Sequence, residues 1–327
     1  MNTLNITQLR EAIETAFYTD IPLMIWGPPG SGKTSAVENV AQQLQVPLKD
    51  IRLSQIESID LRGVPTIIDG KTVWMTPSFF PRDPDSVGII MFDEIPDGDP
   101  STQAACYQFI NERRLGEYEL PAGWRILGAG NPNNGMLTEA LNNRLTHVTV
   151  EPDIADWASW ALENNIHKDI IAFLMARPSL LSCMPTHQDE NAYPTPRTWE
   201  MASRYHSMQP QSAVYRQLME GAVGKGAIIE FFAYMNMKDK LPTIDELLAN
   251  PTGFAEYNSS PSKIAALCLM VVANIERATV DPLMQFLKTV TVDFQVMAIT
   301  IIDQNKNYLM GTKPITEWLS KNANSMG

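Results

Sequence analysis

Short apolar runs alternate with amphipathic segments through the first half of the chain. The runs predict five strands, at Ile21–Trp26, Leu48–Leu53, Val87–Phe92, Trp124–Gly130 and His147–Val150. Between them, apolar residues recur at three- and four-residue steps, as Ala36, Val37 and Val40 do, which is typical of helices with one buried face. Because strands that alternate with helices form parallel sheets covered on both faces, we expect an α/β core over residues 1–150.

After about residue 151 the strand pattern stops, and only helical spacing remains. Prolines and glycines interrupt this spacing and divide it into separate helices. We predict helices at Ile154–Leu162, Asp169–Ala176, Arg197–Ser207, Ala227–Asn236 and Lys263–Glu276, followed by a helical tail. A short amphipathic helix is also expected within residues 1–20. A chain of 327 residues is long enough for two domains, and we expect the second, all-α domain at residues 151–327.

Two segments of the first half depart from the strand and helix alternation. In residues 64–74, two β-rich runs flank Asp69 and Gly70, and this dipeptide is the strongest short hairpin signal. Residues 114–120 alternate in polarity and reach residues 124–127 through a turn containing proline and glycine. The sequence therefore predicts a β-hairpin in each segment.

An apolar cluster follows the first predicted hairpin. Its members are Trp74, Met75, Phe79 and Phe80. Packing in the core is one interpretation. The alternative is that these side chains are exposed and line a pore or anchor a client, because exposed aromatics make good binding anchors.

The charge of the chain limits its partners. It carries 25 lysines and arginines against 37 aspartates and glutamates, so its net charge is -12. An acidic protein has no general electrostatic attraction for nucleic acid, although a local basic patch would still be compatible with that charge. Nucleic acid is therefore not an expected partner.

The cysteines and the apolar runs indicate the compartment. Cys106, Cys183 and Cys268 lie far apart and are odd in number, which fits a reducing environment. No basic-then-apolar leader opens the chain, and the longest apolar run, residues 264–273, has half of the roughly 20 residues that a membrane span needs. We expect a cytoplasmic protein without a membrane span. No metal-binding spacing is found among the four histidines, His147, His167, His187 and His206.

The octapeptide GPPGSGKT at residues 27–34 lies between an apolar run and an amphipathic segment, as a phosphate-binding loop does. Its glycines let several amide N–H groups converge on phosphate oxygens at a helix N-terminus. Lys33 would contact the β- and γ-phosphates of ATP, and the Thr34 hydroxyl would ligate Mg²⁺. The alternative is an ordinary turn rich in glycine and proline. The expected nucleotide contacts are Gly27, Pro28, Pro29, Gly30, Ser31, Gly32, Lys33, Thr34 and Ser35.

The segment GIIMFDE at residues 88–94 is an apolar run that ends in two acids. Asp93, at the end of the predicted strand, would hold Mg²⁺ opposite Thr34, and Glu94 would polarise the attacking water. Two acids after an apolar run are common by chance. Downstream of a phosphate-binding loop they predict the second half of an ATP-hydrolysing site.

Asn131 follows the fourth predicted strand, in the segment AGNPN. Its side chain could orient the attacking water or contact the γ-phosphate. An asparagine before proline is also a common turn residue, and that interpretation remains open.

These motifs carry a resemblance to a known family. The segments GPPGSGKT, IIMFDEI, GAGNP, LNNRLTHV and PTPRTWE occur in this order and resemble an AAA+ ATPase of the MoxR family, within the helix-2-insert clade. The resemblance covers residues 1 to about 210. It implies a P-loop NTPase αβα sandwich with a five-stranded parallel sheet at residues 1–150, followed by an all-α lid and C-terminal helices. It also implies that the hairpin at about 63–77 is the helix-2 insert and that the hairpin at about 113–127 is the pre-sensor-1 insertion.

By the same resemblance, three side chains have roles in hydrolysis: Asn131 matches sensor 1, Arg144 the arginine finger and Arg197 sensor 2. A permanently charged guanidinium suits an arginine that must reach the γ-phosphate of another subunit. Leu145 stands where the family usually has an aromatic residue. Arg113 and Arg114 are rival candidates for the role between subunits, and a local salt bridge or cap is a further alternative for Arg144.

Arg197 follows Pro196 at a predicted helix start, where the helix dipole disfavours a cation unless an anion is close. A phosphate would supply that anion, and a hinged lid could bring Arg197 to it. The alternative is an arginine at a helix N-terminus with no part in catalysis.

The leading hypothesis from the sequence is an Mg²⁺-dependent ATPase that works as a homo-oligomeric ring, a hexamer, and remodels or activates a protein client. The resemblance implies a chaperone-like role with a partner that bears a von Willebrand factor A domain. Two alternatives stay open, a nucleic-acid motor or loader and a slow nucleotide-gated scaffold.

Overall fold

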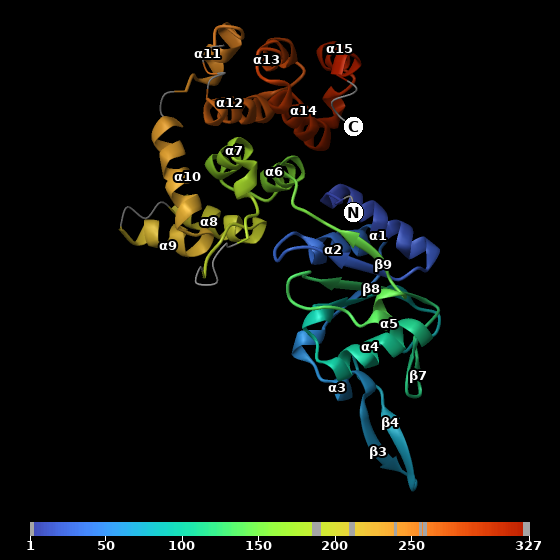
Figure 1. Cartoon of the computed structure of the whole chain (residues 1–327). Helices are drawn as coiled ribbons and strands as arrows, with labels where there is room; N and C mark the ends of the chain where they lie inside the picture. Colours follow the sequence, from blue (N-terminus) through green and yellow to red (C-terminus); the bar gives the residue numbers. More distant parts are fainter. Residues whose placement is uncertain are drawn as a thin grey trace. The chain divides into compact units, whose positions relative to one another are not determined.

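The computed structural model describes residues 3–184, 191–208, 213–238, 241–254, 257 and 260–322. Its internal contacts divide the chain into two compact units, Met1–Glu151 and Pro152–Gly327. Figure 1 shows a sheet with helices in the first unit and helices in the second. The two units are described separately below.

The first unit is built on a five-stranded parallel sheet. Its strands, in the order β2-β5-β8-β1-β9, are β2 (Leu48–Arg52), β5 (Val87–Asp93), β8 (Gly123–Gly130), β1 (Leu23–Trp26) and β9 (Thr146–Thr149). The prediction of a five-stranded parallel sheet is confirmed. Because all pairs are parallel, the carboxyl ends of the strands lie along one edge, and β1 leads there directly into residues 27–34.

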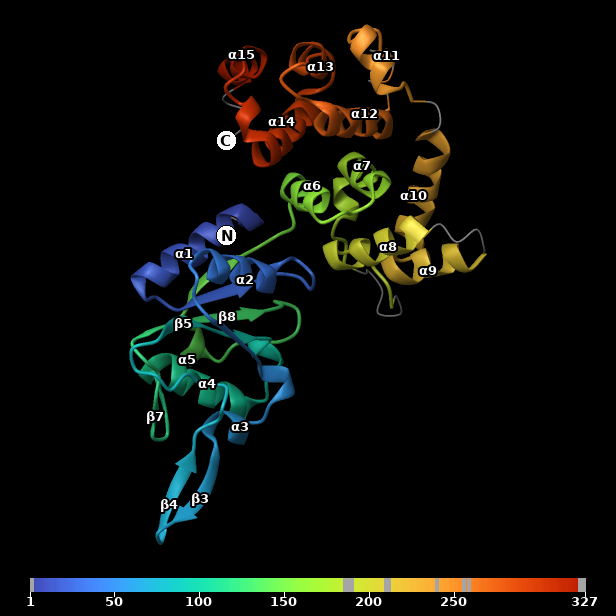
Figure 2. The ribbon, with the colours of Figure 1, turned by 180° about the vertical axis from the view of Figure 1, so that it is seen from behind.

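Helices cover both faces of this sheet, as Figures 1 and 2 show. The covering helices are α1 (Ile6–Thr19) and α2 (Lys33–Gln43) on one face, and α3 (Ser58–Arg62), α4 (Pro100–Glu112) and α5 (Glu139–Asn142) on the other. Strand β5 contributes to both layers, since Ile89 and Met91 are buried with α1 and α2 while Ile90 and Phe92 are buried with α4. Burial on both faces explains why this strand is a continuous apolar run.

Side-chain caps set where α1 and α4 begin. Asn5 and Gln8 form a reciprocal capping box at the start of α1. At α4 the carboxylate of Asp99 accepts hydrogen bonds from the hydroxyls and backbone amides of Thr102 and Ser101. These bonds hold the pKa of Asp99 well below its usual range. Asp99 is therefore a capping residue.

The first predicted hairpin is present as strands β3 (Val64–Ile68) and β4 (Lys71–Met75). Asp69 and Gly70 both have positive φ, of 50° and 74°, which is the conformation that a two-residue type I′ turn requires. In Figure 1 this hairpin projects away from the sheet, beyond α3.

The second predicted hairpin has different partners from those expected. Residues 114–115 (β6) pair with residues 118–119 (β7) around Gly116, whose φ of 58° suits a tight turn. Residues 121–123 lead instead into β8, which pairs in parallel with β5 and β1. Since Trp124 and Ile126 are buried in the sheet, their burial in the core outweighs the local turn signal.

The apolar cluster after the first hairpin is divided between core and surface. Phe80 is 2% exposed and stacks on the rings of Phe109 and Tyr118. Trp74 and Met75, on β4, are 39% and 50% exposed. Core packing therefore holds for Phe80 and is wrong for Trp74 and Met75.

The described part of the second unit contains helices and no strand. These are α6 (Ile154–Glu163), α7 (Lys168–Ala176), α8 (Pro196–Met208), α9 (Ala213–Val223), α10 (Lys225–Lys238), α11 (Ile244–Ala249), α12 (Pro261–Asn274), α13 (Val280–Leu287), α14 (Val292–Lys306) and α15 (Lys313–Asn322). The periodicity identified α6, α7, α8, α10 and α12 but missed α9 and α11. The helical C-terminal region is as expected.

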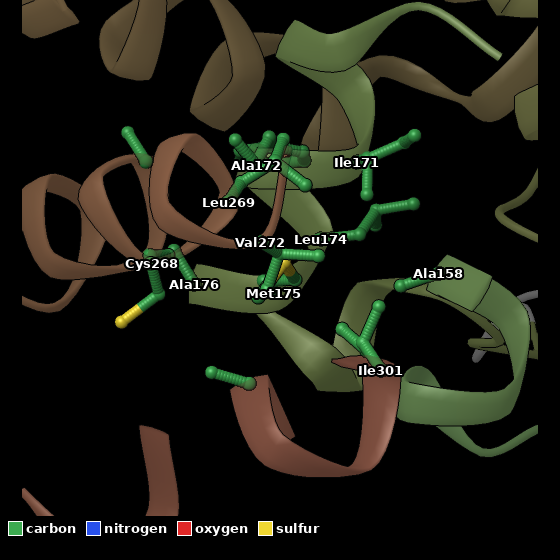
Figure 3. Packing of buried hydrophobic residues seen from close by; sticks show 14 of the residues in the cluster. Ala158, Ile171, Ala172, Leu174, Met175, Ala176, Cys268, Leu269, Val272 and Ile301 are labelled. Atoms are coloured by element: carbon green, nitrogen blue, oxygen red, sulfur yellow. The ribbon is translucent and has the colours of Figure 1, made fainter. Parts of the chain in front are cut away.

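Helix α7 lies at the centre of the core of the second unit, and its residues 169–176 are all buried. Figure 3 shows Cys268, Leu269 and Val272 of α12 beside Ala172 and Met175 of α7. The apolar run at residues 264–273 forms most of α12 and is packed inside this core. Among the described helices, none has the length and apolar character needed to cross a membrane.

Candidate nucleotide-binding site

The backbone of residues 27–32 forms a tight loop that needs glycine. Gly30 and Gly32 have φ of 73° and 86°, in the left-handed region that favours glycine. A Cβ at Gly27 would lie 2.8 Å from both Cγ1 and the carbonyl oxygen of Val150, and 2.9 Å from the Ser31 hydroxyl. The loop can therefore adopt this shape only with the residue types that the motif supplies.

The loop has features that fit a bound phosphate. Ser31 is 3% exposed, and its hydroxyl has no hydrogen-bond partner among the described residues. Helix α2 begins at Lys33, and its N-cap, Gly32, has no side chain to satisfy the first amides. Lys33 Nζ donates to the carbonyl oxygens of Gly27 and Pro28 at 2.9 and 3.0 Å, which holds a cation over the loop. An unsatisfied hydroxyl, a helix N-terminus and an ammonium group together suit an anion.

The ends of α2 and β5 bring a hydroxyl and a carboxylate together. Thr34 Oγ1 donates to Asp93 Oδ2 at 3.3 Å, and Asp93 is buried at the end of β5. The other carboxylate oxygen of Asp93 accepts the backbone N–H of Glu94 at 2.9 Å. Hydroxyl and carboxylate oxygens are ligands that Mg²⁺ prefers, so Thr34 and Asp93 fit the predicted metal role chemically.

Glu94 stands beside this pair in an uncommon conformation. Its φ of 56° is in the left-handed region, which costs free energy for a residue other than glycine and is often found at functional sites. Its carboxylate accepts a hydrogen bond from the hydroxyl of Ser54, which follows β2. The sequence analysis missed Ser54. Its position just after a strand of the sheet, at the edge that holds the other candidates, is the signal that could have found it.

Asp50, on β2, is a second residue that the sequence analysis missed. Burial, and then the charge of Asp93, raises the pKa of Asp50, while Arg52 at 3.8 Å opposes that shift. The charge of Glu94 also raises the pKa of Asp50. Three carboxylates thus lie near one another at this edge, which makes it a region of negative potential suited to a divalent cation.

Asn131 follows the end of β8, next to β1, and is buried. Its amide nitrogen donates to Asn134 Oδ1 at 2.8 Å, and its oxygen accepts the backbone N–H of Asn133 at 3.1 Å. The backbone N–H of Gly27 donates to the carbonyl of Gly130 at 3.2 Å, so the loop and the β8 end are adjacent. The asparagine thus makes turn contacts at a position next to the phosphate-binding loop.

The three arginines near the predicted subunit edge have different surroundings. Arg144 is exposed, donates to Asn111 and lies with its guanidinium carbon 5.6 Å from the centre of the Tyr107 ring. Its partners are both on α4, so Arg144 makes local contacts, but these are a hydrogen bond and a cation–π contact, not the salt bridge or cap considered from the sequence. To act between subunits, Arg144 would have to leave Asn111 and Tyr107 and contact another copy of the chain.

Arg113 and Arg114 are held within their own chain. Arg113 donates to Asp20 at 3.2 Å, and to the carbonyls of Pro121 and Trp124 at 3.1 and 2.8 Å. Arg114 pairs with Glu119 across the β6–β7 hairpin at 3.8 Å. Arg113 therefore ties α4 to the segment before β8, which makes it the weaker rival to Arg144.

Arg197 is the second residue of α8, in the second unit, and its side chain is exposed. The start of α8 is fixed by Thr195 and Thr198, whose hydroxyls and amides bond reciprocally. The sensor-2 role of Arg197 stays a prediction.

The first unit matches a known domain. Residues 22–145 match the AAA domain (dynein-related subfamily). The matched residues contain the phosphate-binding loop, Asp93 and Asn131, so the chain carries an AAA domain in its first unit. No curated protein matches the chain.

Several solved structures are similar to the chain. NtrX from Brucella abortus in complex with ADP is 18% identical, with 98% of this chain and 68% of that chain covered and a TM-score of 0.44. A putative ATPase from Cytophaga hutchinsonii is 15% identical, with 99% and 90% covered and a TM-score of 0.37. A point mutant of RuvB from Thermotoga maritima is 15% identical, with 89% and 86% covered and a TM-score of 0.37. Likenesses this low carry no argument about function.

Proposed function

We propose that this chain hydrolyses ATP with Mg²⁺ at residues 27–34, and that it is a member of the MoxR family that remodels or activates a protein client. The observation that carries the proposal is the 3.3 Å contact between Thr34 and Asp93, with Glu94 beside it. This contact supports the proposal because it brings together two candidate residues that lie far apart in the sequence.

Each side chain then has one role in the reaction. Lys33 and the amides of the loop bind the β- and γ-phosphates, and Thr34 and Asp93 hold the metal. Mg²⁺, when bound, neutralises the charge of the phosphates. Glu94 accepts a hydrogen bond from the attacking water and takes its proton, and the hydrogen bond from the Ser54 hydroxyl to one oxygen of its carboxylate makes it a weaker base. Asn131 orients the same water after leaving its turn partners.

We extend the proposal to a ring-shaped assembly on the basis of two arginines. Arg144 would leave Asn111 and Tyr107 and reach the nucleotide of the next subunit in a ring of six copies, where its guanidinium stabilises the charge of the transition state. Arg197 would contact the γ-phosphate from the helical unit and couple hydrolysis to the position of that unit.

The exposed side chains of the β3–β4 hairpin favour a protein client over other partners. Ile67, Trp74 and Met75 are exposed on it, and large exposed apolar side chains are anchors for protein partners. The net charge of -12 disfavours nucleic acid. We include in the proposal a partner with a von Willebrand factor A domain, on the resemblance of the motif order to the MoxR family.

The proposal is tested with two site variants and matched controls. Lys33→Ala should abolish ATP binding and turnover, and Glu94→Gln should retain ATP binding but lose turnover. Lys288→Ala and Glu163→Gln, exposed in the helical unit, control for the loss of one charge of each kind. Turnover that survives in either site variant would contradict the mechanism.

The Glu94→Gln variant also serves to identify the client. Glu94→Gln loaded with ATP should retain a protein client that the wild type releases. Turnover that rises steeply with single-stranded DNA at low salt would instead identify a nucleic-acid motor. ATP bound without turnover, with or without client, would identify a scaffold.

A further inference from the structure

Three metal-ligating side chains converge in the helical unit, outside the nucleotide site. His167, Asp169 and His206 each place one ligand-type atom within 4.8 Å of the others. His167 caps the start of α7, Asp169 is in its first turn and His206 is in the last turn of α8. The spacing of the histidines in the sequence gave no sign of a metal site, because packing of two different helices joins them. His187 lies outside the described residues.

The distances in this cluster suit one small cation. Asp169 Oδ2 lies 3.2 Å from His206 Nε2 and 3.7 Å from His167 Nδ1. Ligand atoms that surround a tetrahedral Zn²⁺ at its usual bond lengths lie roughly 3.3 Å apart. A single oxygen of Asp169 can therefore share one ion with a nitrogen from each ring.

Burial and orientation also fit a metal site. Asp169 and His206 are 6% and 4% exposed, and His167 is half-buried, which leaves an entry path on its side. The second ring nitrogen of His206, Nδ1, faces the hydroxyl of Tyr215 on α9. Metal-binding histidines generally use their other nitrogen in this way, which fixes the ring. The Phe231 ring, with its centre 5.3 Å from that of His206, supplies an apolar wall.

A chain of hydrogen bonds from Asp169 through His206 to Tyr215 would explain part of this arrangement without an ion. It leaves His167 as the cap of α7 and does not explain why the centre of its ring is 4.3 Å from that of His206. Nor does it explain Tyr234, whose buried hydroxyl has no hydrogen-bond partner among the described residues. A bound ion would account for the approach of the two rings to the same carboxylate.

We propose that His167, Asp169 and His206 bind one Zn²⁺ ion that ties the start of α7 to the end of α8. Two imidazoles and one carboxylate are a donor set for zinc, whereas Mg²⁺ prefers oxygen ligands alone, so this site is chemically separate from the nucleotide site. Binding would exchange the long 3.3 Å bond between the Asp169 N–H and His167 Nδ1 for coordination of that nitrogen. Because the ion binds the folded chain, it stabilises the helical unit.

The test uses the full chain without nucleotide. After dialysis against EDTA, ZnCl₂ is titrated, bound zinc is measured by atomic spectrometry, and thermal unfolding is followed with and without the metal. We expect one zinc per chain and a higher Tm with zinc. His167→Asn keeps a side chain that can cap α7 but removes the imidazole. It should weaken zinc binding by more than the roughly 10- to 100-fold that loss of an outer partner causes.

Two controls separate this site from other zinc ligands. Cys183 is an exposed thiol, and Cys183→Ser should retain the full zinc content. His147→Gln removes a histidine of the first unit and should also retain it. If the His167 variant does not fold, Co²⁺ added to the wild type decides the question. Tetrahedral d–d bands without a thiolate charge-transfer band support the site. No bound metal, zinc lost in Cys183→Ser or no shift in Tm would overturn it.

Discussion

The hydroxyl of Thr34 donates to the carboxylate of Asp93 at 3.3 Å, although the residues belong to different elements and are far apart in the sequence. This contact joins the start of α2 to the end of β5 and places two oxygen ligands side by side. Substitutions at Thr34 and at the residues around this pair are expected to change activity or stability.

Thr34→Ala should raise the Mg²⁺ concentration needed for half-maximal ATPase activity by at least about tenfold, since one of the two proposed protein ligands of the metal is lost. Titration of turnover with Mg²⁺ at saturating ATP measures the change. Thr316→Ala, at an exposed position of α15, is the matched control. An unchanged Mg²⁺ requirement would show that Thr34 does not bind the metal.

Ser54→Ala should increase basal turnover by up to about tenfold and leave ATP affinity unchanged. The Ser54 hydroxyl donates to the carboxylate of Glu94, and such a bond to a charged group is worth about 1.5–3 kcal/mol, which stabilises the ionised carboxylate and makes it a weaker base. Steady-state turnover without client measures the effect. A fall in turnover would mean that Ser54 positions Glu94 for the reaction.

Arg144→Ala and Arg113→Ala should have opposite profiles. Arg144→Ala should lower turnover by on the order of 10³-fold, with ATP affinity and stability nearly intact, because an arginine finger acts on the transition state. Arg113→Ala should destabilise the protein by about 1–3 kcal/mol, since it removes the hydrogen bonds of a charged guanidinium to Asp20 and to the carbonyls of Pro121 and Trp124. Turnover assays and denaturant unfolding separate the two. Full activity of a monomeric Arg144→Ala protein would refute the ring.

Asp50→Asn should stabilise the protein at neutral pH in the absence of nucleotide and metal. The folded state raises the pKa of Asp50, so its charge disfavours folding above its ordinary pKa and the penalty disappears when the carboxyl is protonated. The gain in the free energy of unfolding from Asp50→Asn should therefore be present at pH 7 and vanish as the pH falls below about 4. Urea unfolding at several pH values measures it, with Asp85→Asn in an exposed loop as control. A gain that persists at low pH would contradict this origin.

Local patterns predicted what depends on short stretches of chain. A strand buried on both faces must be apolar throughout, which is why Ile89–Phe92 could be recognised as a central strand. The left-handed turn at Asp69 and Gly70 follows from residue types that tolerate positive φ. The phosphate-binding loop belongs to the same group, because its shape is specified by glycines and a following helix.

Packing between distant segments decided the rest. The alternation in residues 114–120 suggested a hairpin into Trp124, but β6 pairs with β7, and Trp124 is buried in β8, which pairs in parallel with β5. Whether Trp74 is buried depends on what covers β4, and nothing in its local sequence carries that information. Ser54 and Glu94 meet because β2 and β5 are neighbours, and His167 and His206 meet because α7 and α8 pack in one unit.

The residue types of the proposed nucleotide site can thus be read along the chain, because loop and strand-end chemistry depends on near neighbours. Which carboxylate faces which hydroxyl, and which histidines share an oxygen of Asp169, depends on strand order and helix packing. Strand order and helix packing are set by the burial of apolar surface over the whole unit, and no short stretch of sequence contains that information.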